Sequence, residues 1–207
     1  MKPLIKLSVP IAFYLLTTAC NYTGNKSQNL KTSDSAATEN TNNAITDNAY
    51  EKQISTSTGK ILVIKESHPR GASLSDITIT FKNDSSSALS VYDKDPIARL
   101  IVADLDSNGF DELYIITTAV GSGSYGNVVG LASNKDKSLS FINFPDIEEK
   151  DIQKGGFYYG YEGHDTFYIE QKHLVRSFPV NNSGENKKKL AYRLQKTETG
   201  YVLILVS

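Results

Sequence analysis

A glycine- and serine-rich segment that holds one tyrosine is the first candidate for chemistry in this chain. It spans residues 119–128, and at its centre are Gly121, Ser122, Gly123, Ser124, Tyr125 and Gly126. The glycines allow positive φ angles and a thin backbone, and the three hydroxyl groups can donate and accept hydrogen bonds. Apolar, β-branched residues flank the segment on both sides, so the pattern predicts a loop at the tip of a β-hairpin. Such a loop is narrow enough to enter the pocket of another molecule.

The sequence of this segment matches two nucleotide-binding patterns, and both are excluded. Residues 121–126 fit G-x-G-x-x-G, but that fingerprint needs a helix after the third glycine, and Val128, Val129 and Gly130 follow here. The kinase glycine loop also fits, but the chain has no V-A-I-K, H-R-D or D-F-G segment. A structural hairpin loop and a binding loop remain as alternatives. Tyr125 favours binding, because an aromatic side chain at a loop tip is typical of binding hot spots.

An acidic turn at residues 104–112 is the second candidate. Oxygen-bearing side chains occupy its positions one, three, five and nine, which are Asp104, Asp106, Asn108 and Glu112. With Gly109 at position six this is the spacing of a calcium loop, and it resembles the aspartate-rich loops of integrin-type propeller repeats. It is not an EF-hand, because position twelve is Ile115. A hairpin turn whose carboxylates face water or cap backbone amides is the alternative. No cofactor is required by the sequence, and Ca²⁺ stays open.

No set of residues predicts an enzyme. A glycosidase needs two carboxyl groups about 5 to 10 Å apart across a cleft, and four acids on one tight turn are not placed in this way. His68, His164 and His173 are scattered along the chain, and no H-E-x-x-H motif or nucleophile elbow is found. We therefore expect a protein without catalytic residues.

Short strands must position the glycine- and serine-rich segment and the acidic turn. Period-two alternation and apolar, β-branched runs predict strands at residues 60–65, 75–81, 88–92, 97–103, 112–118, 128–132, 138–144, 166–170, 173–178, 190–196 and 201–206. The continuously apolar run at 97–103 is typical of a central strand, and a short helix is expected at 146–154, after Pro145. About ten strands with at most one short helix predict an all-β fold, either a sandwich or a barrel of antiparallel sheets.

The N-terminal residues predict export. Lys2 and Lys6 precede an apolar run at 4–16 that is too short to span a bilayer comfortably, and small residues lead to Cys20. The end of this segment, Leu16 to Cys20, resembles a bacterial lipoprotein signal, in which the cysteine is lipidated; ordinary cleavage after Ala19 is the alternative. We expect a periplasmic protein that is anchored by a lipid to a membrane of the bacterial envelope.

Composition divides the rest of the chain into a tether and one domain. Residues 21–50 are rich in Asn, Ser and Thr and predict a flexible tether, and residues 51–207 have the usual size of one domain. The formal net charge is −1 without a basic stripe, which argues against nucleic acid or anionic membrane surfaces as partners. Cys20 is the only cysteine, so no disulfide can form within the chain.

Five blocks of this sequence, in this order, resemble the bacterial periplasmic inhibitors of i-type (invertebrate) lysozymes. They are residues 103–109 followed by Glu112 and Leu113, then 121–126, 160–165, 174–180 and 192–194. The likeness covers roughly residues 60–206, and the ordered combination is its most specific part. The resemblance implies a secreted antiparallel β-sandwich that inserts the loop 121–126 into the substrate cleft of the lysozyme. It also implies that Ser122 and Tyr125 are the inhibitory residues.

Two functions follow as expectations. The first is inhibition of i-type lysozyme, in which the loop blocks the catalytic carboxylates and so protects the bacterial cell wall from host defence. The second is a calcium-dependent binding or adhesion module of the cell envelope, built around the acidic turn. The expected partner is the lysozyme, contact with a membrane is expected only through the lipid anchor, and the sequence leaves open whether the domain forms a homodimer.

Overall fold

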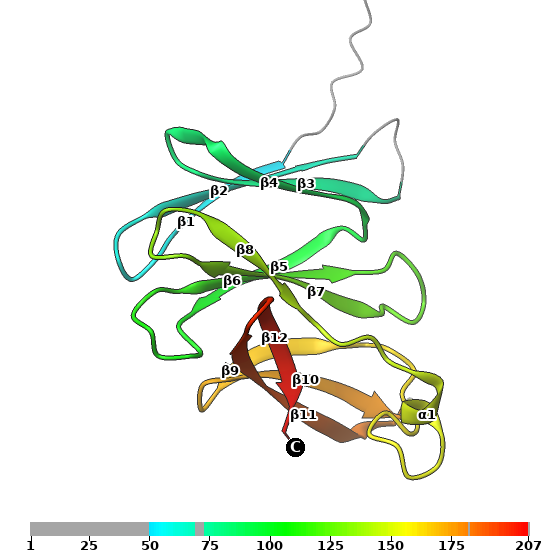
Figure 1. Ribbon diagram of the computed structural model, residues 1–207. Helices are drawn as coiled ribbons and strands as arrows, with labels where there is room; N and C mark the ends of the chain where they lie inside the picture. The colour runs from blue at the N-terminus through cyan, green and yellow to red at the C-terminus, as the bar shows by residue number, and fades with distance from the viewer. Residues whose placement is uncertain (1–49, 69–72, 182, 207) are drawn as a thin grey trace, which may run out of the picture. The chain divides into compact units, whose positions relative to one another are not determined.

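The computed structural model describes residues 50–68, 73–181 and 183–206, all of which belong to one unit by their internal contacts (Figure 1). The predicted signal peptide with Cys20 and the tether up to residue 49 lie outside the described residues. Within the described ranges no helix is long and apolar enough to cross a membrane.

The described residues form two sheets (Figure 1). The smaller one has the order β1-β2-β3-β4, with β1 (Tyr50–Ser55), β2 (Ile61–Ser67), β3 (Ser75–Phe81) and β4 (Asp84–Lys94). The larger one has the order β5-β6-β7-β8-β12-β11-β10-β9. Its strands are β5 (Ile97–Ala103), β6 (Glu112–Thr118), β7 (Gly126–Ser133), β8 (Leu139–Asn143), β9 (Thr166–Glu170), β10 (His173–Val180), β11 (Ser183–Thr197) and β12 (Gly200–Leu205).

Strand β6 is buried on both faces, and this explains its nearly continuous apolar sequence. Leu113 and Ile115 pack with Ile64 and Ile79 of the smaller sheet in one hydrophobic cluster. Tyr114 and Ile116 belong to a second cluster, together with buried residues of β9 to β12. The chain therefore has three β-layers, β1–β4, β5–β8 and β9–β12, with one core on each side of the middle layer (Figure 1).

The larger sheet supplies two of these layers because it folds back on itself. Strands β8 and β12 join its two halves through a short parallel pairing, Tyr201 with Ile142 and Val202 with Asn143. The sheet is thus mixed and nearly closed, like a barrel, and differs from a purely antiparallel two-sheet sandwich. The all-β prediction is confirmed, and the described residues hold twelve strands where about ten were expected.

Three of the elements that differ from their sequence prediction have a clear physical reason. Strand β5 is an edge strand, not a central one, because β6 is its only neighbour among the strands that the structure describes. Strand β1 was not predicted, since its residues are mostly polar and exposed and lack a strand-like apolar pattern, although they pair with β2 along the backbone. The helix α1 spans only Glu149–Ile152, because the chain turns back at Gly156, whose amide donates to Gln153 O at 2.8 Å.

Candidate functional site

The glycine-rich loop closes the hairpin between β6 and β7, as predicted. Thr118 pairs with Gly126 at the ends of the two strands. The Ala119 amide donates to Tyr125 O at 2.9 Å, and the Ser124 amide donates to Gly121 O at 3.1 Å inside the loop. These two hydrogen bonds give the loop a defined backbone conformation, in which Ser124 has a φ of +41°.

The tip of this loop presents side chains to solvent. Val120 is 73% exposed, Tyr125 is 50% exposed, and Ser122 is exposed as well. The Tyr125 ring contacts the Tyr161 ring edge-on, with centroids 5.7 Å apart. Gly123 makes room for the same ring, because a Cβ atom at this position would lie 2.3 Å from Tyr125. The tyrosine is therefore supported on one side and free on the other.

A second segment, residues 160–165, lies outside the hairpin and contacts the loop. The His164 amide donates to Gly123 O at 2.7 Å. Gly163 has a φ of +90°, and a Cβ atom there would lie only 2.0 Å from Gly123 O. Only glycine allows the two backbones to approach this closely. The position of the loop thus depends on a segment about 40 residues further along the chain.

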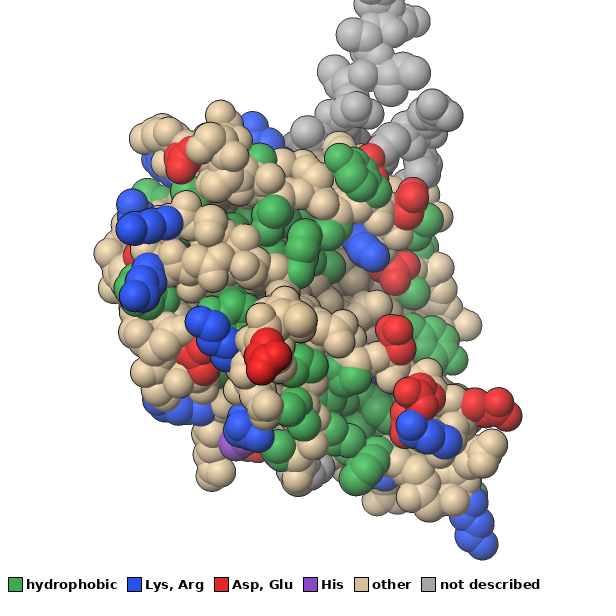
Figure 2. Space-filling model, in the orientation of Figure 1, with side chains coloured by type: hydrophobic (Ala, Val, Ile, Leu, Met, Phe, Trp, Pro, Cys, Tyr) green, Lys and Arg blue, Asp and Glu red, His purple; other side chains and the backbone are tan. Residues whose placement is uncertain are grey.

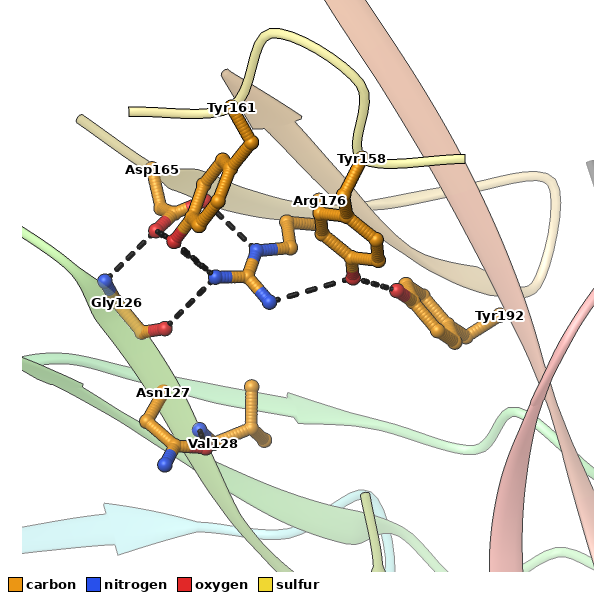
Figure 3. A network of polar contacts seen from close by, with 8 residues as sticks. All are labelled: Gly126, Asn127, Val128, Tyr158, Tyr161, Asp165, Arg176 and Tyr192. Atoms are coloured by element: carbon orange, nitrogen blue, oxygen red, sulfur yellow. Dashed lines mark hydrogen bonds and ion pairs between the residues drawn. The ribbon is translucent and has the colours of Figure 1, made fainter. Parts of the chain in front are cut away.

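A buried ion pair lies beneath the base of the loop (Figure 3). Arg176 Nε donates to Asp165 Oδ1 at 2.7 Å, and its Nη2 donates to Asp165 Oδ2 at 3.0 Å and to Gly126 O at 3.1 Å. Asp165 Oδ2 also accepts the Gly126 amide at 2.7 Å. The side chains of Arg176 and Asp165 are 3% and 0% exposed. The Arg176–Asp165 pair therefore forms hydrogen bonds with both the backbone amide and the backbone carbonyl of Gly126, the first residue of β7.

Three tyrosines complete this network (Figure 3). Tyr161 OH donates to Asp165 Oδ2 at 2.6 Å, and Arg176 Nη1 donates to Tyr158 OH at 3.3 Å, which in turn contacts Tyr192 OH. Burial raises the pKa of the Tyr161 and Tyr192 phenols above the usual range, so both stay neutral. Burial by itself would lower the pKa of Arg176, but the hydrogen bonds that Arg176 donates to Asp165 outweigh burial and raise this pKa above its usual range, so the guanidinium keeps its charge.

Four of the five sequence blocks meet at this place. The loop 121–126, the segment 160–165, Arg176 of β10 and Tyr192 of β11 are joined by the contacts above. The loop residues were predicted from the sequence, whereas the roles of Arg176, Asp165 and Tyr161 were not. The signal for Arg176 was present, because it is a charged residue within the apolar run Leu174 to Phe178. Its partner could not be identified without the fold.

Apolar side chains adjoin the loop. A hollow of about 260 Å³ beside Tyr125 is lined in part by Phe144, Ile147 and Tyr161. On the face shown in Figure 2, hydrophobic side chains also gather between β12 and α1, where Phe157 and Leu205 line a second hollow. The loop is therefore one part of a larger surface that can contact a partner.

The acidic turn joins β5 to β6, at the end of β6 opposite to the glycine-rich loop. The seven residues of β6 separate the two by about 20 Å at roughly 3.3 Å per residue. Asp104 Oδ2 accepts the Gly109 amide at 3.0 Å, and Asp106 Oδ1 accepts the Asn108 amide at 3.1 Å. These contacts are those of an Asx-rich turn. The two candidate sites are thus separate.

Glu112 differs from the other acids of this turn because it is only 1% exposed. Its Oε2 accepts the Leu105 amide at 2.8 Å. Its Oε1 is buried and has no hydrogen-bond partner among the residues that the structure describes. Burial, together with the negative charges of Asp106, Asp104 and Asp111, raises the pKa of Glu112 to about 8. The remaining acid, Asp111, accepts the Ser57 amide at 2.5 Å.

Comparisons of the chain with protein-family models, with curated proteins and with solved structures found no match.

Proposed function

We propose that this chain is a protein inhibitor of i-type lysozyme and that the loop 121–126 is its inhibitory element. The observation that carries the proposal is the half-exposed Tyr125, on a loop whose backbone is fixed from beneath by the Arg176–Asp165 pair. A loop that is already ordered loses less conformational entropy on docking than a flexible one. The choice of i-type lysozyme as the target rests on the five sequence blocks that resemble the lysozyme inhibitors.

The chemistry of the loop suits a glycosidase cleft. Such a cleft ends at two carboxyl groups, and the hydroxyl groups of Ser122 and Tyr125 can donate hydrogen bonds to them. The loop contains no glycosidic bond, so the enzyme binds it without cleaving it. The glycines at 121, 123 and 126 keep the loop narrow enough for a groove that normally holds a saccharide chain.

The β-sandwich of the resembling family can be compared with the three layers found here. We infer that the sandwich corresponds to the layers β1–β4 and β5–β8, which share one hydrophobic cluster. The layer β9–β12 then adds the second core, and its strand β10 supplies Arg176 to the base of the loop.

Titration against lysozyme tests the proposal. The purified protein is added in increasing amounts to an i-type lysozyme that is lysing bacterial cell walls, with a c-type lysozyme in parallel. We expect the activity of the i-type enzyme to fall to near zero as the inhibitor reaches a small molar excess. Full activity at a several-fold excess would overturn the proposal. The c-type series measures how selective the inhibitor is.

A further inference from the structure

The carboxylate of Glu112 is an unusual feature of the acidic turn between β5 and β6. It is buried at the first position of β6, and its Oε1 atom finds no partner within the described part of the chain. A buried carboxylate oxygen without a partner costs free energy, because it has lost its contacts with water. A bound group that is not part of the protein chain would remove this cost.

Two further carboxylates lie close to that of Glu112. Asp104, Asp106 and Glu112 each place one carboxylate oxygen within 4.8 Å of the other two. None of the ion pairs formed between described residues involves any of the three acids. The three carboxyl groups are therefore concentrated in a small volume, and none of them is paired with a cationic side chain of the described residues.

We propose that the carboxylates of Asp104, Asp106 and Glu112 bind one calcium ion. Oxygens that share a Ca²⁺ ion lie about 2.3 to 2.6 Å from it, so they are at most about 5 Å apart, and the three oxygens meet this limit. The buried carboxylate of Glu112 gains a cation as its partner, and the carboxylates of Asp104 and Asp106 gain a counterion. Backbone carbonyls and water complete the six to eight oxygen ligands that calcium takes.

The donor set selects calcium over other common metals. All three ligands are carboxylates, and hard oxygen ligands without nitrogen or sulfur disfavour zinc and copper. Magnesium demands near-ideal octahedral geometry and gives up its water reluctantly, whereas calcium accepts the irregular geometry of a short turn. The turn departs from regular backbone at Ser107, with a φ of +62°, and at Gly109, with a φ of +86°.

Calcium bound at this site would stabilise the folded protein, and in this the site differs from the proposed inhibitory loop. The ion would connect the end of β5 to the first residue of β6, which is the strand buried on both faces. A ligand that binds only the folded state raises the free energy of unfolding. The calcium site and lysozyme inhibition are independent inferences, since they lie at opposite ends of β6.

Thermal unfolding of the purified full chain, with calcium chloride added after treatment with a chelator, tests this inference. At about 10 mM Ca²⁺, roughly ten times the weakest Kd of extracellular calcium modules, we expect Tm to rise by at least roughly 3 °C. The same concentration of MgCl₂ should give a clearly smaller rise. Equal rises with both salts, or no rise with calcium, would overturn the inference.

Two matched variants separate coordination from a general charge effect. Glu112→Gln replaces the carboxyl group of a ligand by an amide, and Asp111→Asn makes the same change at the neighbouring acid, which contacts Ser57 instead. We expect Glu112→Gln to abolish the calcium-dependent rise in Tm and Asp111→Asn to retain most of it. Equal losses in both variants would contradict coordination by Glu112. If Glu112→Gln does not fold, Asp104→Asn, at a partly exposed ligand, replaces it in the same comparison.

Discussion

Tyr125 is the residue on which the proposed inhibition depends most. Its ring contacts Tyr161 on one side, and half of its surface is open to a partner. A ring held in this way can enter a cleft without first having to be ordered. Aromatic side chains with this combination of support and exposure are typical of binding hot spots.

Replacing Tyr125 by alanine should weaken inhibition of i-type lysozyme by about 2 kcal/mol, or roughly 30-fold in the inhibition constant. Tyr125→Phe, which keeps the ring, separates the contribution of the hydroxyl group. Tyr92→Ala is the matched control, because Tyr92 is 64% exposed but lies on β4 of the smaller sheet. Inhibition constants from wall-lysis assays measure all three. Equal effects of the Tyr125 and Tyr92 alanine variants would place the inhibitory site elsewhere.

Asp165 is the residue on which the base of the loop depends. Asp165→Asn keeps the shape of the side chain but leaves the buried charge of Arg176 without its counterion. We expect the free energy of unfolding to fall by about 3 to 5 kcal/mol, as when one partner of a buried ion pair is removed. Urea denaturation measures this change.

The control for Asp165 is an exposed pair. Glu170 lies 3.8 Å from Lys189, and both side chains are more than half exposed. Water and salt screen such a pair, so Glu170→Gln should leave the urea midpoint nearly unchanged. Similar losses for Asp165→Asn and Glu170→Gln would mean that the buried pair does not stabilise the loop as inferred.

At the scale of elements, two hairpin connections at opposite ends of β6 carry different chemistry. One connection presents hydroxyl and aromatic groups to solvent, and the other concentrates carboxylates around Glu112. Both depend on distant segments. The segment 160–165 positions the loop through Gly163 and His164, and Ser57 contacts the acidic turn through Asp111.

Gly163→Ala tests whether the segment 160–165 positions the loop. The added Cβ atom would lie 2.0 Å from Gly123 O, so the loop has to move, and inhibition of lysozyme should weaken. Gly155→Ala is the control, because Gly155 has a φ of +94° but nothing within 4 Å of its Cβ position. Both variants should lose about 1 to 2 kcal/mol of stability from the positive φ. Equal inhibition constants for the Gly163 and Gly155 variants would show that the segment 160–165 does not set the loop conformation.

At the scale of the whole molecule, the three layers depend on strands far apart in sequence. The middle layer contributes to both hydrophobic clusters, so neither outer layer has a core of its own. Strand β1 lies at the edge of the smaller sheet and covers the backbone of β2. An uncovered, largely buried strand such as β2 would present its edge to another chain.

Two fragments test the role of β1. A fragment from Ala44 to Ser207 covers the unit that holds every described residue, and we expect it to fold in one cooperative transition. A fragment from Thr56 lacks β1 and should show a lower urea midpoint and a tendency to self-associate. Urea denaturation and size-exclusion chromatography measure both properties. Identical midpoints and identical apparent masses would contradict this role for β1.

Local features of the chain could be predicted from the sequence because they depend on residues close together. The bounds of β3, β5, β6 and β9 agree with the predicted strands, since alternation and apolar runs reflect the pleat of each strand. The glycine-rich loop was placed correctly between β6 and β7. Strand β11 is longer than predicted because its first half is polar and lysine-rich.

The sequence by itself therefore determined the all-β class, most strands, the loop with its exposed chemistry and the acidic turn. The tertiary structure decided that the larger sheet folds back on itself, that β5 lies at an edge, and that Arg176 meets Asp165 beneath Gly126. It also decided that Glu112, one acid among four, is buried with an orphan oxygen. The physical reason is the range of the forces involved. Strand and turn preferences act within a few residues, whereas burial and ion pairing depend on which distant strands share a core.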